Sequence, residues 1–230
     1  MREIVLDTET TGLDPAQGDR LVEIGCVELV NRIPSGQGFH HYLNPERDMP
    51  AAAFAVHGLS AEFLSDKPLF AEVADTFLEF IGDAPLVIHN ASFDHGFLNA
   101  ELARLKRPPI ARDRLVDTLM LARRKHPGGP NKLDDLCARY GIDNSRRTKH
   151  GALLDAELLA EVYLELIGAR QAQLILSDAS AIQTKVRGAA VSQRPTPLLS
   201  RLTDEERAAH DEFVATLGDQ AVWRKYAAGE

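Results

Sequence analysis

The opening segment, residues 4–12, constrains the fold more than any other part of the chain, because an apolar run there ends in two acids and a glycine. Aliphatic and β-branched residues closed by glycine predict a buried strand. Side chains alternate along a strand, so Asp7 and Glu9 leave one face while Thr8 points to the other. Two carboxylates aimed at one point repel unless a cation lies between them, and oxygen ligands favour Mg²⁺ or Mn²⁺. A solvated strand end gives the same local pattern, so further acids are needed.

The length and composition predict a globular domain with room for an appendage. The chain has 230 residues, of which 44% are hydrophobic and 26% charged, enough to bury a sizeable core. Its two cysteines, Cys26 and Cys137, form no C-x-x-C pair, so packing is their expected role. The sequence shows no signal-peptide pattern and no apolar run long enough to span a membrane, and we therefore expect a cytoplasmic protein.

The charge is unevenly distributed along the chain. The formal net charge of −8 by itself argues against a nucleic-acid partner. Residues 104–149, however, contain 13 Lys and Arg against five acids, a local charge of +8. Such a run fits contacts with phosphates, and solvated helix faces produce similar runs.

The pattern of the first 168 residues predicts an α/β domain on one mixed sheet of about five strands. Residues 21–30 and 32–43 predict a β-hairpin beside the opening strand, with Ser35 and Gly36 near its turn. Further strands are expected at 85–88 and near 115–116. Helical spacing, caps and closing glycines predict helices at 51–56, 60–62, 68–81, 92–105, 117–125, 133–140 and 152–167. Three strands followed by alternating helices and strands are typical of an α/β domain.

The composition changes after Gly168. Residues 177–201 contain Ser, Gln, Pro and Gly with few large apolar residues and predict a flexible linker. Thr203 and Glu206 form a capping box at the start of a short helix. A helix this short is not stable alone, so we expect it to dock on another protein, with packing on the main domain as the alternative.

Three further groups complement the opening pair of acids. Asp94 is expected in the first turn of the helix at 92–105, directly after a strand. His150 is expected in the loop that enters the helix at 152–167, because on one helix it would lie about 140° from Asp155. Each signal alone is weak, since acids are favoured at helix starts by the dipole in any case. Four acids at strand ends and helix starts, together with one histidine, predict a single site.

These motifs resemble the DEDD exonucleases. The matching segments are Asp7-Thr8-Glu9, His89-Asn90 with Phe93-Asp94, and His150 with Asp155 five positions later, a spacing that marks the histidine branch. The similarity covers about residues 1–170 and is greatest to the exonucleases that proofread for bacterial replicative polymerases. It implies a ribonuclease-H-like fold and metal-dependent 3′→5′ hydrolysis of the terminal phosphodiester, releasing nucleoside 5′-monophosphates.

The resemblance also implies a role for each residue of the site. Asp7 would bridge two divalent ions, Mg²⁺ or Mn²⁺, with Glu9 and Asp155 completing one ion site and Asp94 serving the other. Two ions roughly 3.5–4 Å apart stabilise the attacking and leaving oxygens of an in-line displacement. His150 would be the general base, because a neutral imidazole is available near pH 7. A helix-capping role is the alternative for His150.

Five positions match residues that grip the terminal nucleotide in this family: Thr8, Leu13, His57, Asn90 and Phe93. Leu13 and Phe93 would pack on the last bases irrespective of their sequence. His57 and Asn90 would contact phosphate or sugar. Buried packing and turn stabilisation are the respective alternatives. Such contacts suit proofreading, because a mispaired end leaves its duplex at lower cost.

The segment after the core implies a first protein partner. Gln171, Leu174 and Leu176 resemble a short peptide that binds the sliding clamp, although leucine stands where phenylalanine is common. Continuation of the preceding helix is the alternative reading of the same residues.

The C-terminal tail implies a second protein partner. By resemblance, Phe213 and Trp223 would help to bind the polymerase (alpha) subunit of DNA polymerase III, and tethering would raise the effective concentration at the primer end. The expected organisation is an exonuclease domain at 1–170, a linker with the clamp peptide at 171–201 and a binding tail at 202–230. An RNA-trimming relative and a catalytically weak adaptor that stabilises a polymerase complex are the alternative functions.

Overall fold

The computed structural model describes residues 1–169, 202–218 and 222. Two compact units divide the chain, Met1–Leu174 and Ile175–Glu230. The expected linker, the clamp-peptide residues Gln171, Leu174 and Leu176, and the tail residue Trp223 lie outside the described residues.

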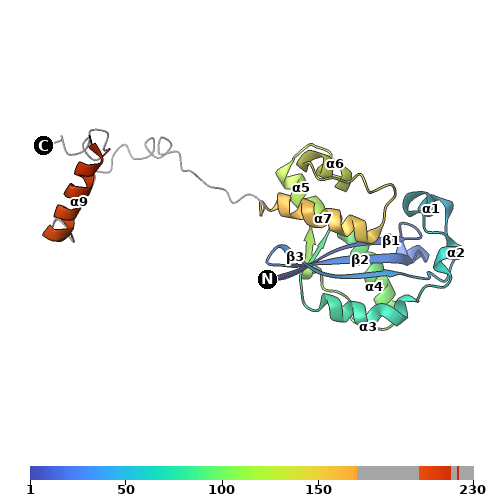
Figure 1. The fold of residues 1–230 in the computed structure, drawn as a ribbon. Helices are drawn as coiled ribbons and strands as arrows, with labels where there is room; N and C mark the ends of the chain where they lie inside the picture. The colour runs from blue at the N-terminus through green and yellow to red at the C-terminus, as the bar shows by residue number, and fades with distance from the viewer. Residues whose placement is uncertain (170–201, 219–221, 223–230) are drawn as a thin grey trace, which may run out of the picture. The chain divides into compact units, whose positions relative to one another are not determined.

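The first unit is built on a five-stranded mixed sheet with the strand order β3-β2-β1-β4-β5 (Figure 1). Its strands are β1 (Arg2–Thr10), β2 (Leu21–Val30), β3 (Ile33–Tyr42), β4 (Leu86–Ile88) and β5 (Leu115–Asp117). β2 pairs antiparallel with β1 and with β3, whereas β4 runs parallel to β1 and β5 parallel to β4. The opening segment is therefore the central strand, and the predicted mixed α/β sheet is confirmed.

The hairpin turn lies between the two predicted strands, a few residues before Ser35 and Gly36. The turn between β2 and β3 consists of Asn31 and Arg32, which have φ angles of 51° and 66°. Two-residue hairpin loops favour such left-handed residues, because their twist matches that of the flanking strands. Ser35 and Gly36 lie inside β3, where the register is irregular opposite Val27 and Leu29.

Helices cover both faces of the sheet (Figure 1). Alternate side chains of β1 pack into two hydrophobic cores, Ile4 and Leu6 on one side of the sheet and Val5 on the other. The Ile4 side is covered by α3 (Phe70–Ile81) and α4 (Ser92–Arg104), and the Val5 side by α5 (Thr118–Lys125), α6 (Leu133–Tyr140) and α7 (Ala152–Leu166). By this alternation, Asp7 and Glu9 continue the face that α7 covers.

The remaining helices of the first unit are short. The short helices are α1 (Ala51–His57), α2 (Ala61–Leu64), η1 (Pro15–Gln17) and η2 (Arg112–Arg114). The helix expected at 68–81 begins at Phe70, because Leu69 is its N-cap and donates its backbone N–H to the Glu72 carboxylate at 2.7 Å.

Gly25 allows β2 and α7 to approach very closely. A Cβ atom at this position would lie 2.3 Å from the carbonyl carbon of Ala152 and from the backbone nitrogen of Leu153. Gly25 is also the register partner of Asp7. The missing side chain therefore lets the first turn of α7, which carries Asp155, sit beside the acidic end of β1.

The described part of the second unit contains α9 (Asp204–Thr216). The Glu206 N–H donates to Thr203 Oγ1 at 3.2 Å, and the Thr203 N–H donates to Glu206 Oε2 at 2.9 Å, which is the predicted capping box. Phe213 on this helix is 58% exposed. Within the described residues, no helix is both long enough and apolar enough to cross a membrane.

Candidate active site

A cleft of about 950 Å³ opens where β1 ends. All five residues of the predicted centre line it: Asp7, Glu9, Asp94, His150 and Asp155. The two acids of β1 meet an acid from the first turn of α4, an acid from the first turn of α7 and a histidine from the loop before α7. The fold thus brings together residues that lie far apart in the sequence.

Asp94 reaches the cleft from the opposite side of the sheet to α7. Thr8 also points to that side, and its hydroxyl donates to Asp94 Oδ1 at 2.7 Å. Both side chains are buried. Thr8 therefore fixes the Asp94 carboxylate on the strand that carries Asp7 and Glu9.

Glu9, His150 and Asp155 form the tightest group in the cleft. Each offers one ligand atom, and these three atoms all lie within 4.8 Å of one another. His150 Nδ1 lies 3.4 Å from Asp155 Oδ2. The imidazole side chain is 48% exposed while that of Asp155 is 3% exposed. A half-exposed imidazole beside buried carboxylates is well placed to exchange a proton with solvent.

Burial and mutual repulsion raise the pKa values of three acids in the cleft, so that a bound cation would stabilise their ionised forms. Burial, reinforced by Asp155 and Glu23, raises the pKa of Glu9 to about 8. Burial also raises the pKa of Asp94 to about 7, against the hydrogen bond from Thr8. The pKa of Asp7 rises well above its usual value because of burial and the charges of Asp94 and Glu9. A cluster of hard oxygen donors with this demand for cations fits divalent ions such as Mg²⁺ or Mn²⁺.

Sequence reasoning missed Arg147, which is central to the site. Its Nε and Nη2 donate to the two carboxylate oxygens of Asp155 at 2.5 and 2.7 Å, and its Nη1 donates to Asp134 at 2.7 Å. Burial alone would raise the pKa of Asp155, but the neighbouring His150 and the hydrogen-bonded Arg147 guanidinium outweigh burial and lower it. Arg147 Nη2 also lies 2.7 Å from His150 Nδ1, and since arginine only donates, this nitrogen is the acceptor.

The residues predicted to grip a nucleotide line the cleft and a neighbouring hollow of about 550 Å³. Thr8, Leu13 and Phe93 belong to both, Asn90 to the cleft and His57 to the hollow. Leu13 is 84% exposed, whereas Phe93 is partly buried against Phe97 with ring centroids 5.0 Å apart. The structure places all five predicted residues around one continuous surface.

His57 is buried at the wall of the hollow. Its Nδ1 accepts the Leu59 N–H at 3.0 Å. Its buried Nε2 makes no hydrogen bond of ordinary geometry within the described part of the chain; burial lowers the pKa of His57, against a weaker contact with the Thr10 backbone. An unpaired buried nitrogen costs free energy that a bound hydroxyl or phosphate would recover.

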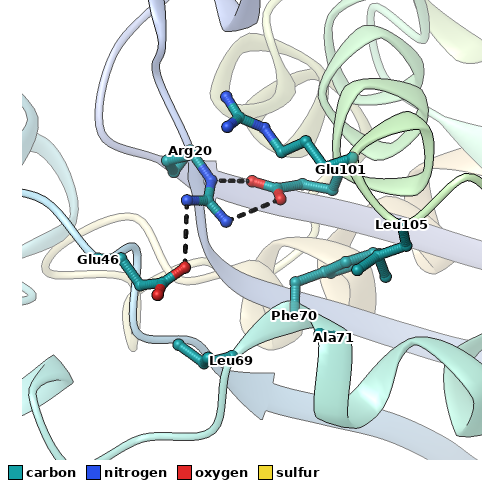
Figure 2. Close-up of a pocket in the computed structure, with 8 residues that line it drawn as sticks. Arg20, Glu46, Leu69, Phe70, Ala71, Glu101 and Leu105 are labelled. Carbon is teal, nitrogen blue, oxygen red and sulfur yellow. Dashed lines mark hydrogen bonds and ion pairs between the residues drawn. The ribbon is translucent and has the colours of Figure 1, made fainter.

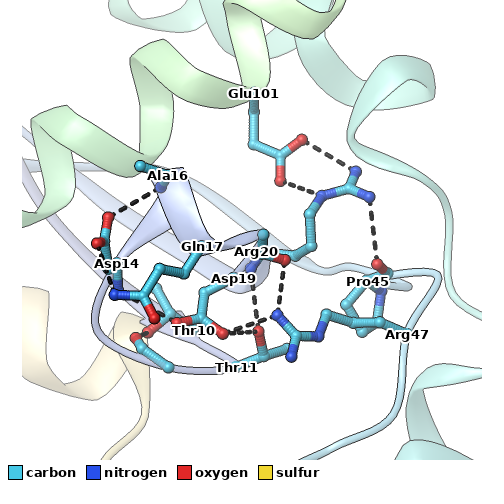
Figure 3. A network of polar contacts seen from close by, with 12 residues as sticks. Thr10, Thr11, Asp14, Ala16, Gln17, Asp19, Arg20, Pro45, Arg47 and Glu101 are labelled. Atoms are coloured by element: carbon cyan, nitrogen blue, oxygen red, sulfur yellow. Dashed lines mark hydrogen bonds and ion pairs between the residues drawn. The ribbon is translucent and has the colours of Figure 1, made fainter.

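The loop that follows β1 and carries Leu13 is braced by ion pairs. Arg47 Nη1 donates to Asp19 Oδ1 at 2.7 Å (Figure 3). Arg20 makes a bidentate pair with Glu101 of α4 at 2.6 and 3.0 Å (Figure 2). Glu101 is almost fully buried, so this pair fixes the loop rigidly to α4. The edge of the hollow is therefore built before any ligand binds.

Comparisons with known proteins agree with this geometry. Residues 4–163 match the family model described as exonuclease, of the RNase T type. The chain is 52% identical to the DNA polymerase III subunit epsilon of Rickettsia conorii, over 94% of this chain and 96% of the relative. It is 47% identical to the same subunit of Escherichia coli K12, over 97% of each.

Two solved structures share the fold. Exonuclease X in complex with 5′ overhanging duplex DNA matches with a TM-score of 0.57 and 25% identity, over 72% of this chain and 91% of that one. The nuclease domain of 3′hExo, a DEDDh family member bound to rAMP, matches with a TM-score of 0.64 and 17% identity, over 73% and 92%. The chain belongs to the exonuclease family of the RNase T type. Within that family it falls among the epsilon subunits of DNA polymerase III.

Proposed function

We propose that this chain proofreads for DNA polymerase III by hydrolysing the 3′-terminal phosphodiester of a frayed DNA end and releasing nucleoside 5′-monophosphates. One observation carries the proposal: four carboxylates and a half-exposed histidine, from β1, α4 and the start of α7, converge in one cleft. The full-length similarity to epsilon subunits supports DNA rather than RNA as the substrate. In a bacterium, this role implies a cytoplasmic location.

The acids of the cleft would hold two divalent ions. Asp7 would contribute to both ions, Glu9 and Asp155 to one and Asp94 to the other. When bound, such ions supply positive charge to the attacking and leaving oxygens of an in-line displacement. Thr8 holds the Asp94 carboxylate in place, and Arg147 holds that of Asp155.

His150 is the proposed general base. Its neutral imidazole would take the proton of the attacking water and pass it to solvent, which its half-exposed position permits. The half-exposed ring lies beside Glu9 and Asp155, the two acids that share its corner of the cleft.

The neighbouring hollow would hold the terminal nucleotide. Leu13 and Phe93 would pack against the last bases, and His57 Nε2 and Asn90 would bond sugar or phosphate. Stacking on apolar side chains is tolerant of sequence. Selection of mispaired ends would then follow from the lower cost of unpairing them.

A primer assay tests this proposal. The full chain, with Mg²⁺ or Mn²⁺, should shorten a 3′-mismatched primer faster than a fully paired one, and single-stranded DNA faster than single-stranded RNA of the same sequence. A variant carrying Asp7→Asn and Glu9→Gln should leave the primer intact. The proposal fails if the mismatched primer survives under conditions where a control exonuclease degrades it. Faster loss of the RNA strand would favour the RNA-trimming alternative.

The similarity to epsilon subunits also supports two protein partners, the polymerase (alpha) subunit and the sliding clamp. Residues 202–230, including Phe213 and Trp223, would bind the polymerase (alpha) subunit, and residues 171–176 would bind the sliding clamp through Gln171, Leu174 and Leu176. The exposed Phe213 on α9 supports a docking role. Co-purification of the alpha subunit with the full chain, compared with a chain carrying Phe213→Ala and Trp223→Ala, tests the first contact. Substituting Gln171 and Leu174 by alanine tests the second.

A further inference from the structure

The cleft has a second wall, made by the end of α5 and the start of α6. Arg123 and Lys132 line the same cleft as the four carboxylates. Both side chains are exposed. Within the described part of the chain, neither the Arg123 guanidinium nor the Lys132 ammonium makes an ion pair or a hydrogen bond. Two cations without a partner therefore line the cleft that contains the four carboxylates.

Other members of the basic run are committed to the fold. Arg107 pairs with Asp75, and Arg146 pairs with Glu157. Backbone carbonyls accept hydrogen bonds from Arg114, Lys125 and Arg139, at Ala84, Glu165 and Pro130 respectively. These five side chains are bonded within the domain, whereas Arg123 and Lys132 line the cleft and have no such bond in the described part of the chain.

The segment between Arg123 and Lys132 is ordered in advance. Asn131 Nδ2 donates to the Gly129 carbonyl at 2.8 Å, and His126 Nε2 lies 2.6 Å from the hydroxyl of Tyr140. The backbone N–H of Lys132 donates to Asp135 at 3.1 Å. The two cations are therefore carried on a fixed wall, so that little ordering is needed when a ligand binds.

The substrate strand needs positive charge beyond the reacting phosphate. Ions held by the acids would neutralise charge at the scissile group, yet each further nucleotide adds another negative phosphate. The acids of the opposite wall repel these phosphates. Lysine and arginine are the side chains that offset such repulsion, and they do so without reading the bases.

We propose that Arg123 and Lys132 form a second phosphate subsite, which binds phosphodiester groups of the substrate strand next to the scissile one. This inference rests on the proposed function and adds the position of the strand within the cleft. The strand then runs from the hollow with Leu13 and Phe93, past the carboxylates, onto the wall between α5 and α6. Because the contacts are with the backbone, they serve any DNA sequence equally.

Two substrates distinguish the contribution of this subsite from that of the reacting centre. One is a single-stranded oligodeoxynucleotide, and the other is the p-nitrophenyl ester of thymidine 5′-monophosphate, which has a scissile phosphate and no further strand. Arg123→Gln and Lys132→Gln should each raise KM for the oligonucleotide about two- to fivefold, the range for an exposed charge pair. Their kcat and their hydrolysis of the ester should be unchanged. The dependence of log KM on log salt should become shallower by about one per substitution.

Arg124→Gln is the matched control. Arg124 is the next residue on α5 and is equally exposed, but it does not line the cleft. The inference is overturned if Arg124→Gln raises KM as much as Arg123→Gln, or if the cleft variants slow the ester and the oligonucleotide alike. Unchanged oligonucleotide kinetics in both cleft variants also overturn it.

A binding measurement keeps the subsite testable apart from hydrolysis. In an Asp7→Asn background, fluorescence anisotropy of a labelled oligonucleotide should show the same two- to fivefold weakening with Arg123→Gln and Lys132→Gln. If the unmodified chain hydrolyses neither substrate while this weakening is seen, the proposed function fails and the subsite stands. If hydrolysis is normal and binding is unaltered, the subsite alone fails.

Discussion

Arg147 joins two helices through its guanidinium group. It donates to both oxygens of Asp155 on α7 and to Asp134 on α6, and its side chain is only 7% exposed. Asp155 is 3% exposed. Removing one partner of a buried pair leaves the other charge without compensation, which is the costly case.

Arg147→Gln should therefore lower the free energy of unfolding by about 3–5 kcal/mol. The measurement is urea denaturation in buffer with a chelator, so that no divalent ion replaces the lost guanidinium charge. Arg146→Gln is the control, because Arg146 is the preceding residue and its exposed side chain lies 3.7 Å from exposed Glu157. Its expected loss is less than about 1 kcal/mol. Equal losses for the two variants would contradict the assignment.

His150→Ala should reduce turnover by roughly 10²–10⁴-fold if the imidazole is the general base. Binding of Mn²⁺, followed by titration calorimetry, should change little. The cluster of Glu9, His150 and Asp155 could also hold an ion through the histidine. A loss of Mn²⁺ affinity as large as the loss of turnover would mark His150 as a ligand instead.

The acids should make stability fall as pH rises when a chelator is present. The pKa of Glu9 is about 8 in the folded chain against 4.5 for a free glutamate. A group whose folded pKa is raised stabilises the fold below its unfolded pKa, and this contribution is lost as pH rises through the folded value. The contribution of Glu9 should thus decline between about pH 4.5 and 8, by up to about 1.4 kcal/mol per pH unit.

Denaturation curves across this pH range check the sign. Glu9→Gln should flatten the decline of the unfolding free energy with pH. Mn²⁺ should reverse this decline, because its positive charge compensates the repulsion between the deprotonated acids. Stability that rises with pH in chelator would contradict the raised pKa values.

At the scale of single residues, the acids were predictable and Arg147 was not. Asp7 and Glu9 follow from strand alternation, and Asp94 and Asp155 from helix starts, all of which are local patterns. Arg147 stands three positions before His150 within a basic stretch, so its sequence context suggests a phosphate contact. Its bonds with Asp134 and Asp155 arise only when α6 packs beside α7.

At the scale of elements, the contact between β2 and α7 fixes how closely the start of α7, and so Asp155, approaches Asp7 and Glu9 on β1. Gly25→Ala should push the start of α7 away from β1, since the new Cβ would meet backbone atoms that cannot rotate aside. Displacement of a catalytic group by about 1 Å is enough to cost roughly 10²-fold in rate. The measurement is kcat on the mismatched primer, together with the free energy of unfolding.

Gly96→Ala provides the control for this substitution. Gly96 lies in α4 close to Asp94, and a Cβ there meets nothing within 4 Å. Alanine is the better helix former, so this variant should gain about 0.5–1 kcal/mol and keep its activity. A Gly25→Ala variant with unchanged kcat would show that α7 tolerates the displacement.

The elements themselves were predictable because their periodicity and caps are local. The predicted strands at 21–30 and 32–43 leave the turn close to Asn31 and Arg32, where it lies, although Ser35 and Gly36 carry the stronger turn composition. Gly25 did carry a signal, since an isolated glycine inside a strand often marks a close backbone approach. What approaches it, the start of α7, lies more than a hundred residues later and could not be read locally.

At the scale of the whole molecule, hydrolysis and partner binding should be separable. A chain ending at residue 169 contains all five residues of the centre and both walls of the cleft. It should hydrolyse the nitrophenyl ester at the rate of the full chain, while failing to co-purify with the polymerase subunit. Gel filtration of the mixed proteins and the ester assay together check this. Loss of ester hydrolysis on truncation would show that the tail contributes to the site.

The basic run shows what composition can and cannot reveal at this scale. Its local charge of +8 is compatible with phosphate contacts and with solvated helix faces alike. The fold divides it, with Arg107, Arg114 and Arg139 bonded within the domain and Arg123 and Lys132 facing the cleft. This division depends on how α5 and α6 pack in the fold. The number of charges in the sequence does not predict that packing.

The central strand β1 is translated long before α7, the helix that completes the site. During synthesis on the ribosome, Asp7 and Glu9 emerge long before Asp155. A nascent or prematurely terminated chain that stops short of α7 therefore has no complete set of ligands. We therefore expect a fragment that stops before α7 to have no nuclease activity.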